Sequence, residues 1–295
     1  MAVANNLNIR PDYFMRYYIV DAFTDQPFRG NPAGVALLEG NTFPKEELML
    51  KIAAELRYSE TAFVRRHSES EYTLRYFTPR TEVELCGHAT IATFSLLHQM
   101  QLAQGECLCH TQAGNLRIEV DEKVLMQMAA PRIVKTIAEV EPIYQALGIN
   151  NYHPQLPVQV AYAGLADIMI PVADVVTLNA LQPDMEAITA MTQKHDAVSF
   201  HVFAFGEDSY AAHVRDFAPL YGVPEESATG TANAALTHYL VVNGIIPAQG
   251  DFAILQGETM GRPSVVATRI TPGGTIFVGG TAYILASGDL HLEME

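Results

Sequence analysis

Short stretches in which hydrophobic and polar residues alternate run through most of the chain and predict strands. The first two lie at residues 17–23 and 33–38, and an amphipathic helix is predicted over residues 44–56. Further strands are predicted at residues 61–65, 72–77, 107–110, 116–120, 124–128, 158–162, 168–171, 198–205 and 210–217, with a short helix at 141–147. This pattern is typical of a mixed α and β protein with mainly antiparallel sheet.

Two stretches break the alternation because they are apolar or small nearly all round. They cover residues 89–97 and 232–240, and each follows a glycine motif, CGHAT at residues 86–90 and TGTAN at residues 229–233. A helix without a polar face is enclosed by other elements. We therefore predict two central helices, each wrapped by sheet.

The two glycine motifs belong to a longer repeat. Each follows a Phe-X-Pro sequence, at residues 77–79 or 217–219, and each motif glycine is followed 27 residues later by another, Gly114 or Gly257. A repeat of this length indicates two homologous halves rather than a stacked array, with a ligand between them.

The length of 295 residues also favours two domains. We place the first over residues 1–135 and the second over residues 136–275, because the sequence pattern changes near residues 131–150. The last segment, residues 276–295, is expected to cross back and complete the first domain. The predicted fold class is α+β, with two pseudo-symmetric domains that each roll a mainly antiparallel sheet around a central helix.

Composition and charge narrow the class of protein. Hydrophobic residues make up 49% of this chain, as in a globular protein, and a net charge of −15 repels nucleic acid. No run of 18 apolar residues predicts a membrane span, and residues 1–16 lack a signal-peptide pattern. We therefore expect a cytoplasmic protein, with Met15 as a second candidate start beside Met1.

The cysteines do not indicate a disulfide framework, because only Cys86, Cys107 and Cys109 occur. Cys107 and Cys109 share one face of a predicted strand. No further cysteine or histidine cluster accompanies them in the sequence, so a zinc site is not predicted.

The starts of the two central helices are candidate anion sites. A glycine there lets the chain turn tightly and leaves N–H groups at the positive end of the helix dipole, where carboxylate or phosphate binds. Because the repeat relates Gly87-His88 to Gly230-Thr231, the two starts can converge on one anion. For either glycine alone, the alternative is tight packing of a strand against a helix.

His88, Glu226 and Glu60 are candidates for proton transfer. The helix dipole disfavours the imidazolium form of His88, so a neutral histidine is expected. Glu226 precedes the second motif by three residues and is expected to face His88, although acidic residues also complement helix dipoles. Glu60 lies between a helix and an apolar strand, where partial desolvation raises a carboxyl pKa; context alone favours a solvated turn residue.

At these residues the chain resembles the PhzF family, the phenazine-biosynthesis isomerase-like proteins with the diaminopimelate epimerase fold. Six motifs carry the resemblance, in order from about residue 17 to residue 288: VDAF at 20–23, GNPA at 30–33, SET at 59–61, CGHAT at 86–90, ESATGTA at 226–232 and QG at 256–257.

The resemblance implies a site between two pseudo-symmetric domains, no metal or organic cofactor, a small carboxylated substrate and a homodimer. Glu60 takes the position of the general acid/base of the family. His88, Glu226 and Thr231 match positions that orient the substrate and assist proton movement. The substrate-binding set that it implies comprises Asn31, Gly87, His88, Gly230 and Thr231.

Two departures from the family pattern bear on the reaction. The phenazine enzymes typically have Asp-Pro-Ala-Thr-Gly-Ser where this chain has Glu226 through Thr231, so the substrate is expected to differ. The epimerases of this fold use two facing thiols; Cys86 matches one of them, but Thr229 stands at the other position. A two-thiol epimerase is disfavoured, because a threonine hydroxyl is too weak an acid.

The leading hypothesis is a cofactor-independent isomerase that moves a proton, and with it a double bond. The second is an amino-acid racemase or epimerase that uses Glu60 or Cys86 with a non-thiol partner. The third is a non-catalytic small-molecule-binding protein that kept the anion site but lost turnover. This hypothesis is based on Glu226 and Thr231, which differ from the residues of the phenazine enzymes.

Overall fold

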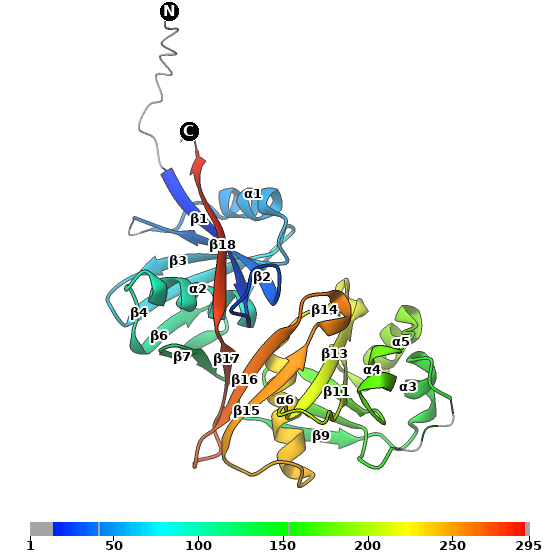
Figure 1. Cartoon of the computed structure of the whole chain (residues 1–295). Coiled ribbons are helices and arrows are strands. Elements are labelled where there is room, and N and C mark those ends of the chain that lie inside the picture. The colour runs from blue at the N-terminus through cyan, green and yellow to red at the C-terminus, as the bar shows by residue number, and fades with distance from the viewer. Residues whose placement is uncertain (1–13, 41, 151, 153, 293–295) are drawn as a thin grey trace, which may run out of the picture.

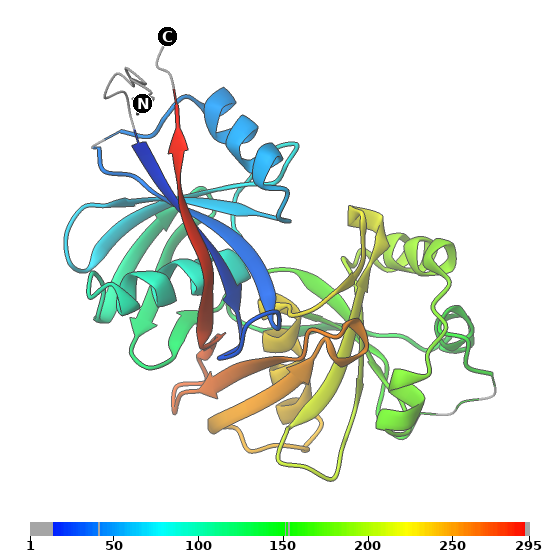
Figure 2. The ribbon, with the colours of Figure 1, turned by 45° about the horizontal axis from the view of Figure 1, so that its top comes forward.

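The computed structural model describes residues 14–40, 42–150, 152 and 154–292, so the candidate start Met1 lies outside the described residues. The chain forms two lobes (Figures 1 and 2). The elements of the first part of the chain are β1 (Phe14–Ala22), β2 (Asn31–Leu37), α1 (Glu46–Leu56), β3 (Thr61–Arg66), β4 (Glu71–Phe77), β5 (Glu82–Val83), α2 (Gly87–Gln99), β6 (Gly105–Thr111), β7 (Gly114–Val120) and β8 (Val124–Gln127).

The second part of the chain repeats this order with more helix. Its elements are β9 (Arg132–Thr136), α3 (Glu141–Ala146), β10 (Gln159–Tyr162), β11 (Ala166–Pro171), α4 (Val175–Asn179), α5 (Met185–His195), β12 (Phe200–Ala204), β13 (Ala212–Ala218), β14 (Val223–Glu226), α6 (Gly230–Val242), β15 (Gly250–Gln256), β16 (Ser264–Ile270), β17 (Ile276–Gly280) and β18 (Ala282–His291). Short 3₁₀ turns lie at Pro219–Tyr221 and Glu258–Met260.

Strand pairing shows the duplication directly. In the first lobe β2 pairs parallel with β3 across α1, and β4 pairs parallel with β6 across α2. In the second lobe β11 pairs parallel with β12 across α4 and α5, and β13 pairs parallel with β15 across α6. A parallel pair needs a crossover connection, which these helices supply. The other described pairings are antiparallel, as the sequence predicted.

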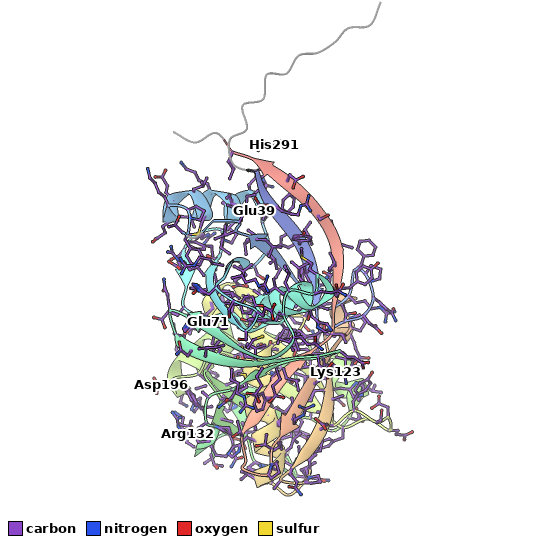
Figure 3. The ribbon with its side chains drawn as sticks, turned by 90° about the vertical axis from the view of Figure 1, so that its left-hand side faces the viewer. Glu39, Glu71, Lys123, Arg132, Asp196 and His291 are labelled. Carbon is purple, nitrogen blue, oxygen red and sulfur yellow. The ribbon has the colours of Figure 1, made fainter. Side chains whose placement is uncertain are left out.

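The two lobes exchange a strand. After β8, the chain passes into the second lobe, where β9 pairs with β10; after β17, it returns to the first lobe, where β18 pairs with β1. Figure 3 shows the result, with Arg132 at the start of β9 in one lobe and His291 at the end of β18 in the other. Because β17 pairs with β8 as well as with β16, the sheet is continuous between the lobes.

The helices α2 and α6 are the cores of their lobes, as predicted. Residues 88–97 of α2 are all buried, and α6 is buried along most of its length. Small residues let the strands approach closely, and threonine hydroxyls bond back to the helix, as Thr90 does to the carbonyl of Cys86. Each helix lies inside the curve of its sheet (Figure 2). The α+β prediction is therefore confirmed.

Among the described residues, no helix is both long enough and apolar enough to cross a membrane. Cys107 and Cys109 are buried in β6 on the same face and are not joined by a disulfide.

Candidate active site

Three titratable side chains meet where the two lobes adjoin. Glu60 lies just before β3, His88 in the first turn of α2 and Glu226 at the end of β14. The Nε2 atom of His88 lies 3.4 Å from Oε2 of Glu60, and its Nδ1 atom lies 3.8 Å from Oε1 of Glu226. One imidazole therefore stands between a carboxyl group from each lobe, and Glu226 faces His88 as expected.

His88 is held in its neutral form mainly by burial. Its side chain is only 6% exposed, and this burial lowers the pKa of His88 while the neighbouring Glu60 raises it. We expected a neutral histidine from the helix dipole, whereas desolvation is the larger cause here. A neutral imidazole has one donor and one acceptor nitrogen, so it can pass a proton between the groups on its two sides.

The surroundings of Glu226 favour its protonated form. Burial raises the pKa of Glu226 to about 8, and the charges of Asp216 and Glu60 act in the same direction. The side chain is not sealed off, since 28% of it is exposed. Glu60 is 21% exposed, so it is not the fully solvated turn residue that context alone favoured.

This titration makes the stability of the fold depend on pH. The folded state favours protonated Glu226, so its contribution is present below the ordinary pKa of 4.5 and is lost as pH rises through about 8. We expect the free energy of unfolding in urea to fall across that window, and Glu226→Gln to reduce the slope. The exposed Glu47 serves as a control, because Glu47→Gln is expected to leave the slope between pH 5 and 8 unchanged. An equal slope in Glu226→Gln would contradict the assignment.

Asn31 connects the lobes at this point. Its Nδ2 atom donates to Oε1 of Glu226 at 3.0 Å and to the carbonyl of Ala228 at 2.9 Å. These amide N–H groups are directed at the second lobe, and the substrate-binding role of Asn31 stays a prediction. The structure therefore places Asn31 where it orients Glu226.

The two motif glycines at the helix starts are not tightly packed. A β-carbon at Gly87 would lie 3.7 Å from Met126 Cε, and one at Gly230 would lie 3.8 Å from Val278 Cγ1, both ordinary contacts. Met126 and Val278 are directly opposite each other in the β8–β17 pair. Packing alone does not require glycine at either position, and both helix starts lie against one strand pair. Thr231, in the first turn of α6, is half-buried.

We expect Gly87→Ala and Gly230→Ala to keep the free energy of unfolding or raise it by up to about 1 kcal/mol, because alanine favours helix. Gly257→Ala is the contrasting variant. Gly257 has a φ of +80°, and a β-carbon there would lie 2.5 Å from the Arg262 carbonyl oxygen, so a loss of more than about 1 kcal/mol is expected. Urea unfolding measures all three. A Gly87→Ala loss as large as that of Gly257→Ala would show that packing requires Gly87.

Cys86 and Thr229 occupy equivalent positions, each directly before a central helix in extended conformation. The Sγ atom of Cys86 lies 3.4 Å from Nδ1 of His88, but burial raises the pKa of the thiol well above its usual value. The Thr229 hydroxyl contacts Oδ2 of Asp216 at 3.1 Å and Oε2 of Glu226 at 3.0 Å. The two positions therefore differ in the side chain, a thiol or a hydroxyl, and also in the groups that it contacts, a histidine or two carboxyl groups.

Three side chains of types that can bind metals also lie close together in the same place. Among the described residues, Glu60, Cys86 and His88 each present one ligand atom, all within 4.8 Å of one another. This donor set fits a metal ion poorly, because a metal binds the thiolate form of cysteine and burial raises the pKa of the Cys86 thiol. The sequence did not predict this grouping, because Glu60 is far from the CGHAT motif along the chain.

Sequence reasoning missed several polar groups that contact His88 or the segment of Glu226 and Thr229. Gln256 accepts from the backbone N–H of Thr229 and donates to the carbonyl of Glu226. Ser59 places its Oγ 3.3 Å from Nε2 of His88. Both lie inside motifs that carried the family resemblance, which is the signal that could have found them. Asp216 has no such signal.

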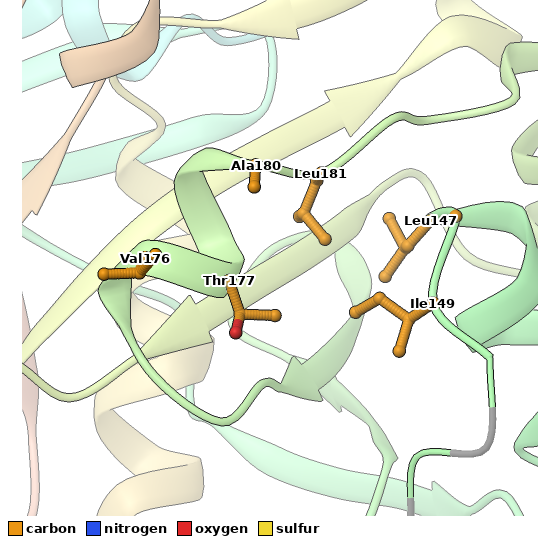
Figure 4. Close-up of a pocket in the computed structure, with 7 residues that line it drawn as sticks. Leu147, Ile149, Val176, Thr177, Ala180 and Leu181 are labelled. Atoms are coloured by element: carbon orange, nitrogen blue, oxygen red, sulfur yellow. The ribbon is translucent and has the colours of Figure 1, made fainter.

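Two hollows lie apart from this site. Figure 4 shows a cavity between α3 and α4, lined by Leu147, Gly148, Ile149, Val176, Thr177, Ala180 and Leu181. It presents no acid, base or cation. A larger groove of about 600 Å³, which includes Arg16, Tyr18 and Arg66, lies on the first lobe. Neither hollow includes Glu60, His88 or Glu226.

A neutral imidazole between two carboxyl groups, at the junction of duplicated lobes, is an acid/base arrangement, and its setting agrees with known proteins. The family described as phenazine biosynthesis-like protein, PhzC-PhzF, matches residues 20–288. An Escherichia coli protein described as the uncharacterized isomerase YddE is 33% identical over 298 residues, covering 94% of this chain and 98% of its own. This chain therefore belongs to the PhzC-PhzF family and is an isomerase.

Solved structures agree with this assignment. A PhzF-family phenazine biosynthesis protein of Bacillus anthracis has a TM-score of 0.84 and 25% identity, covering 94% of this chain and 99% of that one. A hydroxyproline epimerase of Agrobacterium vitis, solved with trans-4-hydroxy-L-proline, has a TM-score of 0.61 and 14% identity, covering 94% and 91%. The second likeness concerns the fold alone.

Proposed function

We propose that the protein is a cofactor-independent isomerase that moves a proton and a double bond in a small carboxylated substrate. The observation that carries the proposal is the unlike pair of carboxyl groups on His88, with Glu226 protonated and Glu60 from the other lobe facing Nε2. Paired carboxyl groups in different environments are a common basis for acid and base roles.

In this proposal Glu60 removes a proton from a substrate carbon, and a proton returns elsewhere on the conjugated system. His88 and Thr231 orient polar groups of the substrate. The backbone N–H groups at Gly87-His88 and Gly230-Thr231 hold its carboxylate, because helix starts favour anions.

The test is a screen in deuterated water with dihydroaromatic and amino-acid carboxylates, followed by mass spectrometry and NMR. The expected result is deuterium at a carbon of one compound class together with a shifted double bond. No exchange with any dihydroaromatic compound, alongside exchange in amino acids, would contradict the double-bond shift.

A racemase or epimerase is the second candidate, because the Cys86 thiol lies 3.4 Å from His88. The raised pKa of that thiol weighs against it as a resting thiolate base. Loss of exchange in Cys86→Ser, with exchange retained in Glu60→Gln, would favour this candidate. The relatives are named isomerases, so we do not retain the non-catalytic binding protein.

We also propose a homodimer, which rests on the family resemblance. Light scattering coupled to size-exclusion chromatography measures the mass directly. Twice the 32.4 kDa chain mass is the expected result, and a monomer at micromolar concentration would contradict it.

A further inference from the structure

A buried line of carboxyl and hydroxyl groups runs from Glu226 into the second lobe. Thr229 Oγ1 lies between Oε2 of Glu226 (3.0 Å) and Oδ2 of Asp216 (3.1 Å). Ser199 Oγ then lies between Oδ1 of Asp216 (2.7 Å) and Oδ1 of Asp167 (2.9 Å). Ser199, Asp216 and Asp167 are at most 2% exposed, so this line is closed to water beyond Thr229.

The number of hydrogen atoms available between these groups shows how many of the carboxyl groups are protonated. A hydroxyl has a single hydrogen, so it can donate to only one of the two carboxyl groups beside it. The other carboxyl group must then donate to the hydroxyl. Two hydroxyls between three carboxyl groups therefore require two extra protons on Glu226, Asp216 or Asp167.

Asp216 is the ionised member of the three. Besides the two hydroxyls, Nδ1 of His201 lies 2.9 Å from its Oδ1 atom, so three donors surround this one carboxylate. The two protons then belong to Glu226 and Asp167, at the ends of the line. Burial raises the pKa of Asp167 to about 7 and that of Glu226 to about 8, which agrees with this assignment.

His201 balances the charge of Asp216. Its Nε2 atom lies 3.3 Å from Oδ1 of Asn233. The orientation of the Asn233 amide is fixed, because its Nδ2 atom donates to the carbonyl oxygen of Thr229 and to Oε1 of Gln256. Both nitrogens of His201 therefore face acceptors, which fits an imidazolium paired with a carboxylate.

The other lobe folds without these charges. Strand register places His201 opposite Asp216, and the equivalent pair in the first lobe is Ala62 opposite Tyr76. The Tyr76 hydroxyl there lies 2.7 Å from the Thr90 hydroxyl, and neither group carries a charge. A buried ion pair costs desolvation that apolar packing avoids. The pair occurs in the lobe of Glu226 and not at the equivalent position of the first lobe, which points to a role in the site rather than in the fold.

We propose that Asp216, paired with His201, is a positioning residue that holds Glu226 in its protonated form through Thr229. Glu226 thereby enters the reaction as the acid, and Glu60 remains the base. Glu226 has three titratable neighbours, which are Glu60, Cys86 and His88. Asp216 has two, which are Asp167 and His201. The catalytic use of the proton rests on the proposed function, but the position of the proton does not.

The test follows Glu226 itself, without substrate, so its result is independent of whether the proposed function holds. Protein labelled with ¹³C at glutamate carboxyl carbons is titrated by NMR, and Glu226→Gln identifies the signal. The midpoint in the unaltered protein is expected near pH 8. In Asp216→Asn it is expected to fall by about one pH unit or more, because a nearby negative charge is removed. The exposed Asp251→Asn is the matched control, with an unchanged midpoint.

A midpoint near 4.5 in the unaltered protein, or an unchanged midpoint in folded Asp216→Asn, would overturn the proposal. If Asp216→Asn does not fold, neutron diffraction from crystals of the unaltered protein at pH 7 decides. Deuterium on Glu226, on Asp167 and on both nitrogens of His201, with none on Asp216, supports the proposal. Deuterium on Asp216, or none on Glu226, overturns it.

Discussion

Glu60→Gln is expected to lower the rate of solvent deuterium exchange at least about 100-fold, the lower end of the range for general acid/base catalysis. An amide keeps the size of the side chain and its contact with His88 but cannot take up a proton. Mass spectrometry of the compound found in the screen measures the rate. The free energy of unfolding should stay nearly unchanged, since Glu60 is half-buried and burial favours the neutral form of its neighbour His88, so that no charge pair is broken.

The matched control is Glu71→Gln. Glu71 also lies beside a histidine, with its Oε1 2.9 Å from Nε2 of His110, but this pair is on the surface of the first lobe (Figure 3). Exchange at the unaltered rate is expected there. Exchange in Glu60→Gln that equals the Glu71→Gln rate would remove Glu60 from the mechanism.

Arg262→Met is expected to lower the free energy of unfolding by about 3 kcal/mol, the lower end of the range for breaking a buried ion pair, because the Arg262 side chain is itself 29% exposed. Arg262 lies 2.8 Å from Oδ1 of Asp21, whose side chain is fully buried. It also donates to the carbonyls of Gly30 and Arg29, in the loop that leads to Asn31. Without Arg262, Asp21 is left as an uncompensated buried charge between the lobes. Urea unfolding measures the loss.

Two further variants show whether the buried charge of Asp21 causes the loss of stability in Arg262→Met. Arg16→Met breaks an arginine–aspartate pair with Asp289 that is exposed on both sides, so little change is expected. Adding Asp21→Asn to Arg262→Met removes the stranded charge and should recover part of the loss. A double variant no more stable than Arg262→Met would point to the lost backbone contacts instead.

The sequence was sufficient for the central features of the fold. The all-round apolar stretches became α2 and α6, and the 27-residue spacing of the repeat places Gly114 and Gly257 at equivalent turns, each with positive φ. Helix α5 was missed although Asp184 caps it by accepting from two backbone N–H groups. That cap signal is local and could have been used. The predicted domain bounds remain a prediction.

The residues of the candidate site that stand in motifs were predictable from the sequence. The residues that are brought together only by strand register were not. Glu60, His88 and Glu226 stand in motifs, and the structure brings all three together. Asp216, His201 and Asp167 are on separate strands, and their meeting depends on the register of β11, β12 and β13. Alternation along one strand shows that a residue points inward, but not which residue of another strand it meets.

We propose one site, shared by the two lobes, that holds a carboxylate within reach of Glu60. The most direct measurement is a crystal structure of Glu60→Gln with the exchanging compound bound. We predict its carboxylate on the N–H groups at Gly87-His88 and Gly230-Thr231, with the exchanging carbon next to residue 60. A compound bound instead in the groove of Arg16 and Tyr18, or in the cavity of Figure 4, would contradict the account.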